Sequence, residues 1–97
     1  MRSYLLVFNG DQVSRKTVIA HLDSLKVILN WMAFFDNAIC VVSEVDAASL
    51  SESIHTVLPE IQFIVTELES GKKKGWLPKT VWKFMNHPMV APSEAAE

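Results

Sequence analysis

Five lysines near the C-terminus give this sequence its clearest binding chemistry. They are Lys72, Lys73, Lys74, Lys79 and Lys83. Two tryptophans, Trp76 and Trp82, lie among them. An ammonium group attracts phosphate, so we expect these lysines to contact nucleic acid. The alternative is a solvated lysine-rich turn, with both tryptophans anchored in the core or in a protein interface.

The charges are divided unevenly along the chain. Residues 1–70 carry four lysines and arginines against nine aspartates and glutamates. Residues 71–97 carry five lysines against two glutamates. A short basic segment therefore follows an acidic body, and such a segment can contact phosphate although the net charge of the chain is −2.

Other residue types that perform chemistry occur singly or at unsuitable spacings. Asp11 is a candidate ligand for a divalent metal ion, and its alternative role is that of a turn residue after Gly10. Cys40 lies in an apolar run, which favours a packed core thiol over a nucleophile. The three histidines are 34 and 32 residues apart, which is not the spacing of a zinc site. We expect no cofactor.

Length and composition indicate one small folded domain. The chain has 97 residues, of which 49% are hydrophobic, enough for a single core. One cysteine cannot form an internal disulfide. The longest apolar runs, Tyr4 to Phe8 and Trp31 to Phe35, are too short for a signal-peptide core or a membrane span. We expect a soluble cytoplasmic protein.

Hydrophobic periodicity divides the chain into seven elements. We expect strands over residues 3–9, 31–35, 38–43 and 62–68, and helices over residues 14–30, 49–58 and 78–86. Asn86 to Pro88 would end the last helix, and residues 89–97 would form a flexible tail. The single domain would therefore span residues 1–88.

Short local signals set the expected boundaries. Ser14 suits the N-cap of the first helix, and Asn30 suits a left-handed residue that closes it. Asp36 and Asn37 suit a two-residue hairpin turn with positive φ. The Ser49-Leu-Ser-Glu52 sequence has the form of a capping box and would open the second helix.

The order of these elements predicts an α+β fold, the ferredoxin-like βαββαβ plait, with a short extra helix after it. Four antiparallel strands would carry two helices on one face. The first and third strands are apolar on both faces, so the second face of the sheet also needs a cover. The segment around Trp76 and Trp82 could fold back over it, or a second copy could stack on it. We expect a homodimer in which both contribute, with an interface formed by Trp31, Phe35, Trp76 and Trp82.

The pattern resembles a family of small bacterial proteins described as SinR-like, which are related in fold to the small CRISPR adaptation subunit. The matching stretches are YLLVF at 4–8, Leu22 to Trp31, AICVV at 38–42, LSESI at 50–54 and FIVTEL at 63–68. The resemblance implies a homodimer packed through its sheets, a nucleic-acid surface and, in some members, metal-dependent nuclease activity. That family carries Tyr-Asp at the end of the first strand, where this chain has Phe8-Asn9 and its nearest carboxylate is Asp11.

Three functional hypotheses follow. The first is a non-catalytic homodimeric binding module that contacts a partner, nucleic acid included, through the basic segment. The second is a metal-dependent nuclease that uses Asp11 across a dimer axis. The third is a small-ligand sensor whose site lies between the sheet and the C-terminal helix.

Overall fold

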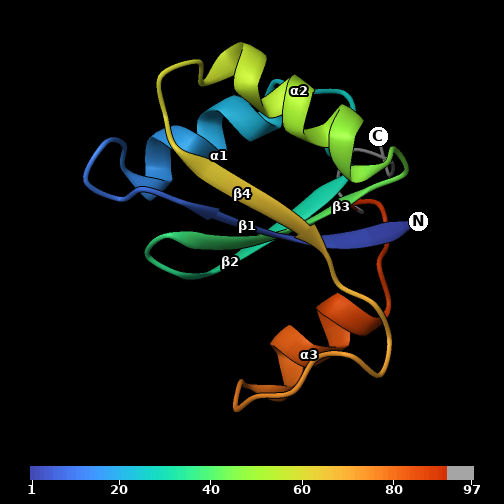
Figure 1. The fold of residues 1–97 in the computed structure, drawn as a ribbon. Helices are drawn as coiled ribbons and strands as arrows, with labels where there is room; N and C mark the ends of the chain where they lie inside the picture. The colour runs from blue at the N-terminus through green and yellow to red at the C-terminus, as the bar shows by residue number, and fades with distance from the viewer. Residues whose placement is uncertain (92–97) are drawn as a thin grey trace.

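An antiparallel sheet of four strands, with three helices around it, organises the described part of the chain. The computed structural model describes residues 1–91 (Figure 1). The elements are β1 (Arg2–Phe8), α1 (Arg15–Asp23), β2 (Asn30–Phe35), β3 (Ala38–Ser43), α2 (Ala47–Val57), β4 (Phe63–Glu67) and α3 (Lys79–Asn86). The predicted α+β class is therefore confirmed.

The sheet has the strand order β2-β3-β1-β4. Helices α1 and α2 cover one face of it, and α3 lies against the other (Figure 1). This element order and topology are compatible with the ferredoxin-like plait that the sequence predicts. No helix among residues 1–91 is long and apolar enough to cross a membrane.

The main core lies between the sheet and the first two helices. Alternate side chains of β1, those of Tyr4, Leu6 and Phe8, are at most 3% exposed and point into it. The register pairs Tyr4 with Val41 and Leu6 with Ile39, so β3 adds its own buried side chains to the same face. β1 lies between β3 and β4, as expected for a strand that is apolar on both faces.

A second, smaller core lies on the opposite face of the sheet. Val81 and Met85 of α3 pack against Cys40 of β3, whose side chain is fully buried. The hydroxyl of Ser3 donates a buried hydrogen bond of 2.9 Å to the carbonyl oxygen of Met85, which fixes the end of α3 on β1. The C-terminal segment therefore does fold back over the second face, as one of the two predicted covers.

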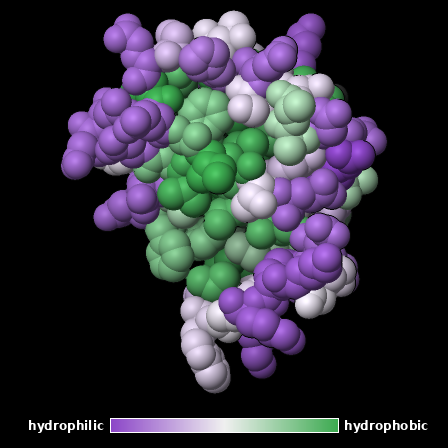
Figure 2. Space-filling model, in the orientation of Figure 1, coloured by the Kyte–Doolittle hydropathy of each residue, from purple (hydrophilic) through white to green (hydrophobic). Residues whose placement is uncertain are grey.

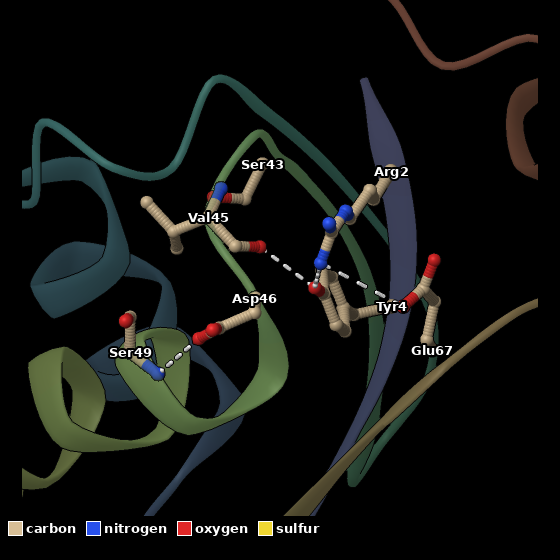
Figure 3. A network of polar contacts seen from close by, with 7 residues as sticks. All are labelled: Arg2, Tyr4, Ser43, Val45, Asp46, Ser49 and Glu67. Atoms are coloured by element: carbon tan, nitrogen blue, oxygen red, sulfur yellow. Dashed lines mark hydrogen bonds and ion pairs between the residues drawn. The ribbon is translucent and has the colours of Figure 1, made fainter.

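Polar contacts fasten the start of β1 to its neighbours (Figure 3). The hydroxyl of the fully buried Tyr4 donates a hydrogen bond of 2.7 Å to the carbonyl oxygen of Val45, in the connection between β3 and α2. The Arg2 guanidinium lies 3.5 Å from the same hydroxyl and 3.9 Å from a Glu67 carboxylate oxygen of β4. Tyr4 thus fills the core with its ring while its polar atom is satisfied at the rim.

The first helix is shorter than predicted. Ser14 is its N-cap, as expected, and accepts a hydrogen bond from the backbone N–H of Thr17 at 3.2 Å. The helix ends at Asp23, and Asn30 is the first residue of β2 rather than the residue that closes the helix. Leu25 and Ile28 lie in the irregular segment between α1 and β2 but still pack on the core, so the helical spacing of apolar residues continues beyond the end of the helix.

Two further local predictions were wrong. α2 is capped by Asp46, whose carboxylate accepts a 2.8 Å hydrogen bond from the N–H of Ser49, so Ser49 lies inside the helix and not at its cap. Hydrogen bonding to Ser49 lowers the pKa of the Asp46 carboxyl. Within residues 1–91 no residue other than glycine has positive φ, so Asp36 and Asn37 turn the hairpin without the left-handed conformation.

The segment after α3 returns to the sheet. The side-chain amide of Asn30 donates to the carbonyl oxygen of Met89 at 3.0 Å, and the N–H of Ala91 donates to the carbonyl oxygen of Leu29 at 2.9 Å. Residues 89–91 of the predicted tail are therefore bonded beside the start of β2. The rest of that tail, residues 92–97, lies outside the described residues.

The rate at which the Cys40 thiol reacts reports whether α3 detaches from the sheet. Burial raises the pKa of this thiol to about 12, and the charge of Lys73 lowers it by a smaller amount. The thiol is therefore protonated at neutral pH and is also shielded by α3, and both effects oppose its reaction. We expect a thiol reagent at pH 8 to leave the folded protein unmodified and to label the chain fully in denaturant.

A pair of variants identifies the opening motion. Met85→Ala loosens α3, and we expect it to speed the labelling of Cys40 at least about tenfold. Leu58→Ala is the matched control, because Leu58 and Met85 are both 6% exposed but Leu58 packs in the other core. Equal acceleration by both variants would show that the thiol is exposed only by unfolding of the whole domain.

Candidate functional site

The connection between β4 and α3 displays the basic segment. Its first turn is closed by a hydrogen bond of 3.2 Å from the N–H of Lys72 to the carbonyl oxygen of Glu69. Gly71 has φ +79° in this turn, a conformation that favours glycine. The turn leaves Lys72 and Lys74 exposed, while Lys73 is half-buried with its ammonium 3.4 Å from the Glu69 carbonyl oxygen.

Trp76 lies in the same connection and has no cover. Its side chain is 100% exposed, whereas Trp82, in α3, is half-buried against the second core. Large aromatic side chains are seldom left fully in water, because burying them is worth a few kcal/mol. The prediction that both tryptophans are anchors therefore holds for the packing of Trp82 and not for Trp76 within a single chain.

An open groove lies between this connection and α3. Its lining residues are Ser70, Gly71, Lys73, Lys74, Gly75, Trp82 and Asn86. None of them is acidic. A Cβ placed on Gly75 would lie 3.8 Å from Cζ2 of Trp82, so the backbone at Gly75 runs beside the indole ring. The groove thus joins two ammonium groups, polar side chains and the partly exposed ring of a tryptophan.

The five predicted lysines do not form one site. Lys73 and Lys74 line the groove, and Lys72 precedes them on the exposed turn. Lys79 is exposed in the first turn of α3. Lys83 lines a different hollow, between α3 and β2. Sequence reasoning missed Ser70 and Asn86 as lining residues; the glycines on either side of the lysine run were the available signal of a turn that brings the backbone close to α3.

Comparison with known proteins assigns no family. No protein-family model matches the chain, and no curated protein or solved structure matches it with significance. The function is therefore inferred from the chain's own residues.

The remaining predicted interface residues lie on different faces. Trp31 is half-buried on the helix side of the sheet, where its indole N–H donates a 2.7 Å hydrogen bond to the Asp23 carboxylate. Phe35, at the end of the β2–β3 hairpin, is 54% exposed. Trp31 therefore does not lie with Phe35 on the open face of the sheet.

The candidate metal ligand Asp11 lies in the exposed turn between β1 and α1. Its backbone N–H donates a 2.9 Å hydrogen bond to the side-chain oxygen of Asn9, which is the turn role considered as its alternative. Among residues 1–91, no group of three or more His, Cys, Asp or Glu side chains lies close enough to hold a metal ion. Asp11 therefore does not belong to a cluster of three such side chains within this part of the chain.

The different burial of the two tryptophans predicts that the same substitution will affect stability at Trp82 and not at Trp76. We expect Trp82→Ser to lower the free energy of unfolding by about 1.5–3 kcal/mol, because the indole packs on the second core. We expect Trp76→Ser to change it by less than about 0.5 kcal/mol, because the side chain has no contacts to lose. Urea denaturation followed by far-ultraviolet circular dichroism measures both. A Trp82→Ser protein as stable as the parent would contradict the account of the covered second face.

Proposed function

We propose that the chain is a homodimeric binding module with a ferredoxin-like plait, and that it contacts single-stranded nucleic acid through the connection between β4 and α3. The observation that supports this most is the full exposure of Trp76 beside a run of three lysines. Lysines neutralise phosphates, and an exposed indole offers a face on which an unpaired base can stack.

The position of the basic segment favours the loop over the sheet as the binding surface. The second face of β3 is covered by α3; it carries Cys40 and Val42, which are buried, and no aromatic side chain for stacking. The groove beside α3 instead offers Lys73, Lys74 and the ring of Trp82 within one open surface. Stacking needs bases that are free of a partner, so single strands suit this site better than duplexes.

A titration with labelled oligonucleotides tests this proposal. We expect a dT12 strand to bind at 50 mM salt and to bind several-fold more weakly at 200 mM, as phosphate contacts require. Trp76→Ala should weaken binding about tenfold, within the range for loss of one stacked base. Replacement of Lys72, Lys73 and Lys74 by glutamine should weaken it further and flatten the salt dependence.

Controls separate this site from general charge effects. Lys26→Gln removes an exposed lysine of the acidic body, in the segment between α1 and β2, and should leave binding unchanged. Absence of binding at either salt concentration, or equal losses in the Lys26 and Trp76 variants, would contradict the proposal. Cleavage of the strand that requires Mg²⁺ and disappears in Asp11→Ala would favour the nuclease hypothesis instead.

The dimer of this proposal would use the part of the second sheet face that α3 leaves open. Ile64 of β4 is 63% exposed and Phe35 is 54% exposed, with Leu5 and Val7 of β1 half-buried on the same face. Figure 2 shows apolar side chains gathered in this region, between the upper helices and α3. The β1 and β4 side chains of this face carry no charge, so a second copy could meet the same surface without repulsion between like charges.

Light scattering after gel filtration tests the dimer. We expect the parent protein to have twice the mass of the chain at micromolar concentration, and Phe35→Ser with Ile64→Ser to give the mass of a single chain. Trp76→Ser is the control, because it removes an exposed aromatic side chain that lies outside the sheet. A monomeric parent protein, or a dimer unaffected by the double substitution, would contradict this interface.

A further inference from the structure

A separate hollow lies on the side of α3 that faces β2. It has a volume of about 280 Å³. Its lining residues are Asn30, Met32, Thr80, Lys83, Phe84, His87, Met89 and Val90. The groove that Lys73 and Lys74 line shares none of these residues, so the two hollows are distinct. The small-ligand hypothesis placed a site between the sheet and the C-terminal helix, which is where this hollow lies.

Three segments form its walls. Met32 pairs with Cys40 in the sheet and therefore points to the face that α3 covers. α3 packs with Val81 and Met85 on that face, which leaves Phe84 of the same helix beside β2. The third wall is the segment after α3, which is fixed by the hydrogen bond from Asn30 to the carbonyl oxygen of Met89.

The lining combines apolar walls with a basic rim. Met32 and Phe84 pack against the second core, and Met89 and Val90 are 64% and 46% exposed. Lys83 and His87 are the titratable lining residues, and no aspartate or glutamate lines the hollow. Within residues 1–91 the Lys83 ammonium has no ion-pair partner. Covering exposed apolar walls with a ligand favours binding, and a carboxylate that pairs with the free ammonium adds a charged hydrogen bond.

We propose that this hollow binds a small apolar carboxylate, with its hydrocarbon part against Met32, Phe84 and Met89 and its carboxylate toward Lys83. The volume is just below the usual range for small-molecule sites, which suits a medium-chain acid rather than a long lipid or a peptide helix. The amide of Asn30 is already engaged with Met89, so Thr80 and His87 are the polar groups left to orient the ligand.

Methyl NMR with octanoate as the probe tests this assignment. The chain has four methionines, of which Met32 and Met89 line the hollow while Met1 and Met85 do not. In protein labelled with ¹³C at the methionine methyl groups, we expect octanoate to shift the Met32 and Met89 signals and to leave that of Met1 unchanged. Equal shifts of all four signals would indicate general detergent-like contact, and no shift of Met32 or Met89 would also overturn the proposal.

Two substitutions examine the charge. Lys83→Met keeps the apolar stem and removes the ammonium, and we expect it to weaken octanoate binding about tenfold while leaving the weaker binding of octanol unchanged. Lys79→Met is the matched control, since Lys79 is exposed in the same helix but does not line the hollow. Equal affinity for octanoate and octanol, or equal losses in the two lysine variants, would contradict a carboxylate site.

A filled hollow gives an independent check. Thr80→Trp places an indole in the space, and we expect it to abolish the octanoate shifts while the circular dichroism spectrum stays that of the parent. Unchanged shifts in that folded variant would place octanoate elsewhere. These measurements do not involve nucleic acid, so their outcome is independent of the proposed function.

Discussion

Burial of β3 on both of its faces is the constraint on which the other elements depend. All six residues of this strand, from Ala38 to Ser43, are buried. Side chains of a strand alternate between faces, so a strand of this kind needs one layer above the sheet and another below it. α1 and α2 supply the first layer, and α3 supplies the second.

The need for the lower layer explains why the basic connection is shaped as it is. β4 ends at the edge of the sheet, whereas α3 must pack on Cys40 of the inner strand β3. The chain between them has to leave the edge and turn beneath the sheet, which it does with Gly71 at positive φ. A backbone on this route is exposed to solvent, so Lys72, Lys74 and Trp76, which it carries, are exposed as well.

The strands could be predicted well from sequence, because β-branched and aromatic runs fill them. The end of α1 could not, since Leu25 and Ile28 continue the helical spacing but pack on the core from the irregular segment after the helix. The face occupied by Trp31 could not be predicted either, because the residues from Trp31 to Phe35 are all apolar and leave no alternation to set the register.

The helix caps were predicted only in part, because more than one residue could provide the capping hydrogen bond of the same helix. Asp46 and Ser49 are both good cap residues three positions apart, and the carboxylate of Asp46 is the one that accepts the hydrogen bond. In the candidate site, the lysines were evident from composition. Their division between two hollows depends on how α3 is rotated about its axis, which a basic run does not encode.

The way α3 is attached has a consequence for limited proteolysis. Three successive lysines on an exposed turn form a ready substrate for a trypsin-like protease. The packing of Val81 and Met85 on Cys40, together with the Ser3 hydrogen bond, holds α3 without help from the peptide bonds of that turn. A cut there would leave a nicked protein of two fragments, and the smaller fragment would remain as a removable cover over the underside of the sheet.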